Sequence, residues 1–251
     1  MRQNFADRKQ KSLSNLQARL PLFHGISSIF FLKASFVGHL RGCCPILGQS
    51  SGLCPYRFCE KHRDIAFHAF TNGTLIDDDF CKEMLRVGNF FVSVSIEGFE
   101  EANDGRRGDG HFQRALAAMD LMRSYRIPFG VSICYTSRNY QVVTSDEFLD
   151  LLISKGCVFA WYFHYMPVGQ NADTSLLLSP EQRIYMKNRV REIRGVTGGK
   201  ELYCIDFQND GEFAGGCVAG GRIYCHINAA GDVEPCVFIH YSSANIKEQS
   251  F

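Results

Sequence analysis

Cysteines are the residues in this sequence with the clearest capacity for chemistry. The chain has 11 cysteines among 251 residues, and most of them gather toward its two ends. In a chain of this length whose N-terminus is polar and basic, clustered thiols favour metal or iron–sulfur ligation over a disulfide framework. Cys81, Cys134 and Cys157 stand alone in apolar stretches, and we expect them to be core thiols. The clusters are Cys43, Cys44, Cys54 and Cys59 near the start, and Cys204, Cys217, Cys225 and Cys236 near the end.

The most specific spacing lies in the C-terminal cluster. Thirteen residues separate Cys217 from Gly231, and four separate Gly231 from Cys236. The run 228–232, Asn-Ala-Ala-Gly-Asp, predicts a hairpin that brings Cys217 and Cys236 together, with Cys225 as a third thiol nearby. Soft thiolates select zinc or an iron–sulfur cluster, and ordinary core cysteines in a hairpin are the structural alternative. Further ligands for zinc would be His226 and His240.

A second set of polar residues lies at the expected C-terminal ends of strands, where α/β folds place their sites. The run 104–108, Asp-Gly-Arg-Arg-Gly, adds cations that could meet a carboxylate in bidentate fashion. Each residue alone has an ordinary explanation, because Asn-Gly is a common turn and an arginine pair in a glycine-rich loop is usually solvated. Only the whole set indicates a site. Its members are Asn72, Ser95, Glu97, Arg107 and Ser132.

Strands and helices must alternate to position these residues. Apolar runs predict strands at 65–71, 90–96, 129–136 and 158–166, with amphipathic helices between them. The predicted helices span 77–88, 111–126 and 144–155, the last with a capping box of Thr144 and Glu147. Another helix begins at Ser179 as N-cap, with Pro180 in the first turn and Gln182 as capping-box partner, and a loop covers 98–110.

This alternation predicts an α/β fold with a parallel sheet, either an open doubly wound sheet or part of a barrel. Small polar side chains share one face of two strands, which suits a barrel lumen that holds a polar ligand. A sheet face packed on helices is the alternative. The residues on these faces are Ser93, Ser95 and Glu97 in one strand and Gly130, Ser132, Cys134 and Thr136 in the next.

The helical periodicity stops after Gly195, and glycines and cysteines follow. We therefore predict three parts. Residues 1–59 form an aberrant N-terminal segment, 60–196 a partial barrel, and 197–251 a small cysteine-containing hairpin module.

Composition restricts the classes of partner. The formal net charge is +1, with 45% hydrophobic and 21% charged residues, which is typical of a globular protein. A balanced charge gives no electrostatic reason to expect nucleic acid or an anionic membrane. No apolar run reaches the roughly 20 residues that a membrane helix needs. We predict a cytoplasmic protein without nucleic-acid or membrane partners.

Together these residues resemble the radical S-adenosylmethionine (SAM) superfamily, in particular its members with a C-terminal SPASM or twitch iron–sulfur domain. The resemblance extends over residues 60–251 and is most specific in the cysteine module. The segments that carry it are 71–74 (Thr-Asn-Gly-Thr), 93–98 (Ser-Val-Ser-Ile-Glu-Gly), 104–108 with Gly110 and Phe112, 166–169 (Met-Pro-Val-Gly), and the spacing of Cys217, Gly231 and Cys236.

The resemblance implies an incomplete, TIM-like (β/α)6 barrel whose strand ends bind SAM against a 4Fe-4S cluster. Reductive cleavage of SAM would give a 5′-deoxyadenosyl radical, with electrons from a low-potential donor. The radical would abstract hydrogen from an unknown substrate, which we expect to be a peptide because SPASM members often modify peptides. Asn72, Ser95, Glu97, Arg107 and Ser132 would lie around SAM, and Cys217, Cys236 and Cys225 would ligate an auxiliary cluster.

Two departures from the family pattern bear on activity. The CxxxCxxC cluster loop is absent, since nine residues separate Cys44 from Cys54 and four separate Cys54 from Cys59. A Gly-Gly-Glu-Pro segment before the strand at 65–71 is also absent, and the sequence stops soon after Cys236, before the further cysteines that a complete auxiliary site needs. We therefore predict a frameshifted or misassigned start and a truncated end, hence an incomplete or inactive form. The alternatives are a degenerate barrel that binds SAM or a peptide without catalysis, a zinc-binding module, and a gene product with no stable function.

Overall fold

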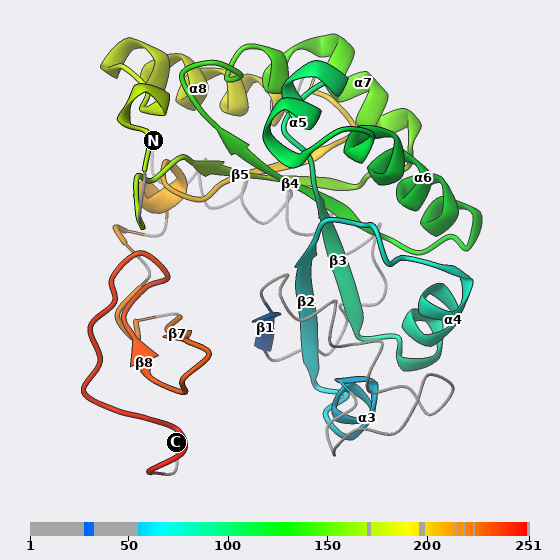
Figure 1. The fold of residues 1–251 in the computed structure, drawn as a ribbon, viewed down its shortest axis with the longest axis vertical. Helices are drawn as coiled ribbons and strands as arrows, with labels where there is room; N and C mark the ends of the chain where they lie inside the picture. Colours follow the sequence, from blue (N-terminus) through cyan, green and yellow to red (C-terminus); the bar gives the residue numbers. More distant parts are fainter. Residues whose placement is uncertain are drawn as a thin grey trace.

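The computed structural model of the protein describes residues 28–32, 55–169, 172–195, 199–213, 215–217, 219–222 and 224–249. Its central element is a six-stranded sheet in which the strands follow one another in sequence order and every neighbouring pair is parallel (Figure 1). This arrangement confirms the predicted partial barrel. The strands are β1 (Ser28–Leu32), β2 (Ile65–Thr71), β3 (Phe90–Ser95), β4 (Gly130–Tyr135), β5 (Phe159–His164) and β6 (Tyr203–Asp206).

Helices cover one face of the curved sheet (Figure 1). Short 3-10 helices interrupt the connections at Val142–Thr144 (η4), Thr174–Leu176 (η5) and Asp210–Glu212 (η6). Among the described residues, no helix has the length and apolar character needed to cross a membrane. The helices are α3 (Pro55–Lys61), α4 (Asp78–Val87), α5 (Glu100–Arg107), α6 (His111–Ser124), α7 (Asp146–Ser154) and α8 (Pro180–Ile193).

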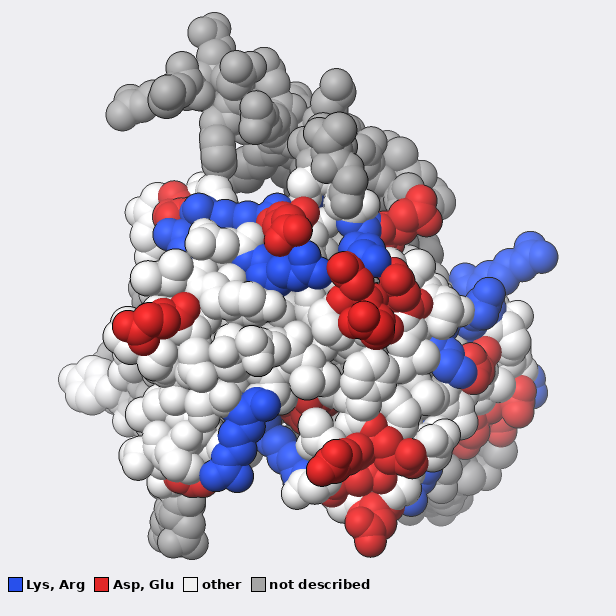
Figure 2. Space-filling view, turned by 90° about the horizontal axis from the view of Figure 1, so that it is seen from above, with Lys and Arg blue, Asp and Glu red and all other residues white. Residues whose placement is uncertain are grey.

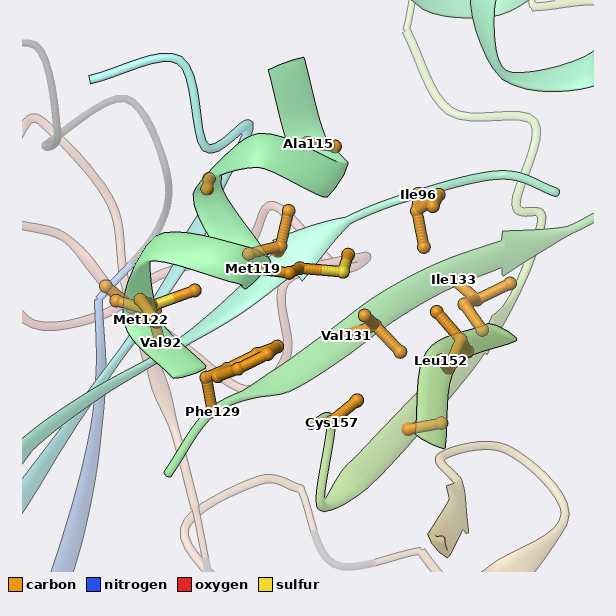
Figure 3. Packing of buried hydrophobic residues seen from close by; sticks show 14 of the residues in the cluster. Val92, Ile96, Ala115, Met119, Met122, Phe129, Val131, Ile133, Leu152 and Cys157 are labelled. Carbon is orange, nitrogen blue, oxygen red and sulfur yellow. The ribbon is translucent and has the colours of Figure 1, made fainter. Parts of the chain in front are cut away.

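The hydrophobic core lies between the sheet and these helices. Val92, Val131 and Ile133 point from alternate positions of β3 and β4 toward Met119 of α6 and Leu152 of α7 (Figure 3). All five side chains are fully buried. Burying a side chain of this kind contributes about 1.5–3 kcal/mol, so these contacts hold β3 and β4 against the helices.

Local capping explains where two of the helices begin. Asp77 accepts a hydrogen bond from the Phe80 amide at the start of α4, and Gly88 ends that helix with φ of 72°. At α8, Ser179 and Gln182 form a complete capping box, with Pro180 in the first turn. The capping box of α8 follows the sequence prediction, because a cap depends on residues only three apart.

Removing the α8 cap should give a measurable but modest loss. We expect Ser179→Ala to lower the free energy of unfolding by about 1 kcal/mol, because the Gln182 amide loses its acceptor. Urea unfolding followed by circular dichroism measures the change. Ser154→Ala is the control, since the exposed Ser154 hydroxyl only donates to the Leu151 carbonyl within α7. An equal loss in both variants would contradict the capping role.

Two local predictions were wrong. The segment 98–110 is not a loop throughout but contains α5, whose first turn carries Glu100 and Glu101 and whose last turn carries two arginines, as the helix dipole favours. The glycines in this segment favoured a loop prediction, because glycine has a low helix propensity. The cap of α7 is Ser145, which accepts from the Phe148 amide, whereas the Thr144 hydroxyl donates to the Tyr140 carbonyl.

Ordered structure also crosses both predicted domain boundaries. β1 lies within residues 1–59 and pairs with β2, and α3 begins before residue 59. At the other end, β6 lies beyond residue 196 and pairs with β5. The sheet therefore includes strands from outside residues 60–196. The division of the chain into three parts stays a prediction. The remainder of the predicted aberrant segment, including Cys43, Cys44 and Cys54, lies outside the described residues.

The C-terminal residues contain the predicted hairpin. Its strands, β7 (His226–Ile227) and β8 (Val233–Glu234), are antiparallel. The Asn228 amide donates to the Asp232 carbonyl at 3.0 Å, and Gly231 has φ of 98°, as the sequence indicated. Aromatic contacts between Phe163, Phe207 and Tyr224 connect the inner face of the sheet to this segment, with ring centroids 5.3 and 6.2 Å apart.

The charged side chains on the helical side are mixed in sign. Figure 2 shows Lys and Arg interspersed with Asp and Glu over the face that it presents. A nucleic-acid-binding surface is typically a patch or stripe of one sign. This face therefore gives no support to a nucleic-acid partner.

Candidate functional site

Four of the predicted site residues, Ser95, Glu97, Arg107 and Ser132, lie where two neighbouring strands separate. β3 and β4 pair only from Ser93 and Gly130 to Ser95 and Ser132, whereas β4 and β5 pair over the full length of both strands. The last backbone bond between β3 and β4 runs from the Ile96 amide to the Ser132 carbonyl, at 3.0 Å. Crevices outside the carboxyl ends of parallel strands are where α/β folds bind ligands. We call the residues around this opening the β3–β4 rim: Ser95, Glu97, Arg106, Arg107, Ser132 and Cys134.

Glu97 is the buried anion of the rim. Its side chain is 1% exposed, and one carboxylate oxygen accepts from the Cys134 amide at 3.2 Å and from Arg106 at 3.2 Å. The other oxygen pairs with Arg107. Burial raises the pKa of Glu97, and the two guanidinium groups oppose that rise. Both carboxylate oxygens are therefore engaged by the protein itself.

The two arginines differ in their surroundings. Arg106 is 42% exposed and also approaches the Cys134 carbonyl, whereas Arg107 is 23% exposed. The buried Nε of Arg107 has no hydrogen-bond partner among the described residues. Two guanidinium groups face one carboxylate, so the rim carries an excess positive charge that favours an anionic ligand.

Asp104 forms no ion pair with either arginine among the described residues. Its carboxylate accepts from the Gly110 and Phe112 amides, each at 2.7 Å, and so caps the start of α6. The arginines of the run 104–108 pair with Glu97, from outside the run, but each contacts a different carboxylate oxygen, so the pairing is not the bidentate one that the sequence suggested.

The remaining predicted residues lie at the same end of the sheet. Ser95 and Ser132 are register partners on the inner face, and both are half-buried. Asn72 follows Thr71, the last paired residue of β2, and is exposed. Its side-chain oxygen accepts from the Thr74 amide and hydroxyl at 3.1 and 2.9 Å, which makes a local turn. Asn72, Glu97 and Ser132 thus lie on the same side of the sheet, toward the C-terminal ends of β2 and β3. Their binding roles stay predictions.

Aromatic rings fill much of the inner face around the small polar positions that the sequence analysis placed on two strands. His68 stacks on Phe91 and Trp161 with centroids 4.5 and 5.7 Å away, and Trp161 stacks on Phe163. His68 Nε2 lies 2.8 Å from the Ser93 hydroxyl, and burial lowers the pKa of His68 to about 3. The small polar surface is therefore confined to β3 and β4. The sequence signal for these rings is the alternation of aromatic residues in the strand at 158–166.

Sequence analysis missed the asparagines that hold the rim together. Asn103 is fully buried and accepts from the Glu97 amide at 3.1 Å. Asn139 is 8% exposed and donates to the Glu97 and Cys134 carbonyls at 3.0 and 3.3 Å. No spacing rule marks either residue, because their partners lie on other elements.

The cysteines do not form an assembled metal site in the described part of the chain. Cys217 is exposed and Cys225 and Cys236 are half-buried. No group of three or more His, Cys, Asp or Glu side chains among the described residues is arranged to hold a metal ion. The residues present therefore do not fit a complete 4Fe-4S or zinc site, and ligation by Cys217, Cys225 and Cys236 stays a prediction.

Other cysteines have structural surroundings. Cys59, Cys81 and Cys157 are buried in the hydrophobic core. Cys134, expected in the core, is instead half-buried on the inner face of the rim, where burial raises its pKa. Tyr224 lies beside the Cys236 thiol, and burial together with this thiol raises the pKa of the Tyr224 hydroxyl.

Comparison with known proteins identifies relatives of the chain. It is 29% identical to the AdoMet-dependent heme synthase of Methanosarcina barkeri over 72% of the chain and 57% of that protein. It is 27% identical to the mycofactocin maturase MftC of Mycobacterium tuberculosis over 70% of the chain and 47% of that protein. No family model matches. By name, the first relative is an AdoMet-dependent synthase and the second is a maturase, which agrees with the resemblance to radical SAM enzymes.

The chain is similar to radical SAM enzymes.

Solved structures share the fold of this chain. The structure of anSMEcpe with bound AdoMet and Cp18Cys peptide aligns with a TM-score of 0.58 at 21% identity, over 76% of the chain and 57% of that structure. Streptococcus suis SuiB bound to S-adenosylmethionine aligns with a TM-score of 0.61 at 15% identity, over 78% and 49%. At these identities the likeness shows the fold. The chain spans about half the length of the curated relatives it matches.

Proposed function

We propose that this chain is the barrel part of a radical SAM enzyme and binds SAM at the β3–β4 rim. The observation that carries the proposal is the unpartnered, buried Nε of Arg107 within a rim that has two guanidinium groups and one carboxylate. The carboxylate of SAM is the anionic group that would complete this pairing. Ser95 and Ser132 would offer hydroxyls beside it, and Asn72 would border the same opening.

Glu97 contributes by orientation in this proposal. Its carboxylate is held by Arg106, Arg107 and the Cys134 amide, so it fixes the arginines rather than contacting SAM. When bound beside a reduced cluster, SAM supplies a 5′-deoxyadenosyl radical in this family. The roles that we propose for the rim side chains are binding and orientation.

The substrate we propose is a peptide. Two structural relatives were solved with peptides, anSMEcpe with Cp18Cys and SuiB with the precursor peptide SuiA, and mycofactocin maturase is among the curated relatives. A low-potential electron donor and a cytoplasmic location belong to the same proposal. A barrel that binds SAM or a peptide without catalysis is the second candidate, favoured by the missing CxxxCxxC loop.

SAM binding tests the proposal directly. We expect Arg107→Gln to weaken SAM affinity about tenfold or more, because one charge-assisted hydrogen bond to the ligand carboxylate is lost. Isothermal titration calorimetry measures the dissociation constants. 5′-Methylthioadenosine, which lacks the carboxylate, should bind wild type and Arg107→Gln equally.

Arg114→Gln is the matched control, because Arg114 is an exposed arginine of α6 whose guanidinium donates to the Asp109 carbonyl. Its SAM affinity should equal that of wild type. Equal affinity of Arg107→Gln and wild type would refute the assignment of Arg107. Absence of SAM binding by the wild-type chain would refute the proposed function.

A further inference from the structure

The separation of β3 and β4 is bridged by side chains instead of backbone bonds. Beyond the bond from the Ile96 amide to the Ser132 carbonyl, the Glu97 carboxylate accepts from the Cys134 amide. On the other side of the same gap, the Asn139 carboxamide donates to the carbonyls of Glu97 and Cys134. These two contacts set how far apart the strand ends lie.

Asn139 is itself held in one orientation. Its side-chain oxygen accepts from the Thr136 amide at 2.7 Å and from the Thr136 hydroxyl at 3.0 Å. Because that oxygen is fixed by donors, the amide nitrogen must point toward the two carbonyls. The assignment of oxygen and nitrogen therefore follows from the hydrogen-bond network.

Three sets of contacts hold Glu97: one to its backbone amide, one to its backbone carbonyl and one to its carboxylate. Asn103 accepts from its amide, Asn139 donates to its carbonyl, and its carboxylate holds both arginines. The backbone of Glu97 lies beyond the end of β3, so no sheet ladder fixes it. Losing the Asn139 contact would let the Glu97 backbone shift and carry the guanidinium pair with it.

We infer that Asn139 is a positioning residue of the candidate SAM site, acting through Glu97 on Arg106 and Arg107. This role rests on the proposed function as far as SAM is concerned. The effect on the arginines themselves is a property of the chain and can be measured without ligand.

The test compares the same substitution at two buried asparagines. Asn139→Asp keeps the oxygen that Thr136 donates to but removes both donations across the gap. Asn89→Asp is the matched control. Asn89 is 7% exposed against 8% for Asn139, and its amide donates to the carbonyls of Cys59, His62 and Ile65 at the opposite end of the strands. Both variants lose donations to backbone carbonyls, but only one touches the rim.

Two readouts separate positioning from general destabilisation. The first is the rate at which phenylglyoxal modifies Arg106 and Arg107, followed by peptide mass spectrometry. The second is SAM affinity by calorimetry. For Asn139→Asp we expect faster arginine modification and SAM affinity about fivefold to tenfold weaker, as the loss of a hydrogen bond to the positioned group predicts. Asn89→Asp should change neither, whatever its unfolding midpoint.

Asn139→Ser, which removes the donations without adding a charge, gives the same test if Asn139→Asp does not fold. Equal arginine reactivity in wild type and the Asn139 variants, or equal changes in the Asn89 and Asn139 variants, would overturn the inference. Faster arginine modification in a chain that binds no SAM would uphold the positioning role and overturn the proposed function instead.

Discussion

Replacing Gly130 by alanine should destabilise the barrel by about 1–3 kcal/mol, because the new methyl group has no room. Gly130 lies on the inner face of β4, opposite Phe159 of β5, and an added Cβ would overlap the Phe159 ring. The ring cannot move away easily, since it also contacts the rings of Phe91 and His68. Chemical denaturation measures the loss.

A matched glycine shows whether the effect comes from crowding. Gly105 lies within α5 with nothing near its would-be Cβ, so Gly105→Ala should be neutral or stabilise by up to about 1 kcal/mol through helix propensity. Phe159→Leu combined with Gly130→Ala should recover part of the loss, with a coupling of about 0.5–3 kcal/mol. Strictly additive effects would mean that the two residues do not compete for space.

The second large effect concerns iron. Anaerobic reconstitution with iron and sulfide should give labile, substoichiometric iron and no cleavage of SAM. A stable 4Fe-4S cluster is normally held by about four cysteine ligands. Only Cys217 and Cys236, with Cys225, follow the auxiliary pattern, and Cys59 of the N-terminal cluster is buried in the core. Iron and sulfide assays, electron paramagnetic resonance and product chromatography measure the outcome.

Variants identify where any residual iron is held. Replacing Cys217 and Cys236 together by alanine should abolish iron retention, whereas Cys81→Ala, in the core, should leave it unchanged. One stable cluster with SAM cleavage on reduction would show instead that Cys43, Cys44 and Cys54 take part in a catalytic loop. That result would show that the chain is catalytically active, and it would exclude a barrel that binds SAM or a peptide without catalysis.

The sequence predicted the parts of this protein that depend on near neighbours. The capping box at Ser179 and the turn before Gly231 each involve residues a few positions apart, so local dihedral preferences decide them. The alternation of strands and helices has the same origin, since the period of apolar residues follows from backbone geometry. It was sufficient to predict a partial parallel barrel and to place the candidate residues at one end of it.

Only the tertiary structure decided how the site residues face one another. Glu97 lies 37 residues from Cys134 and 42 from Asn139 along the chain, and strand register alone brings them into contact. That register turned Glu97 from a predicted SAM ligand into the proposed holder of two arginines, and it revealed Asn139. It also filled the inner face with aromatic rings from β2, β3 and β5. Contacts between strands depend on where each strand ends and how the sheet curves, which no local pattern in one chain encodes.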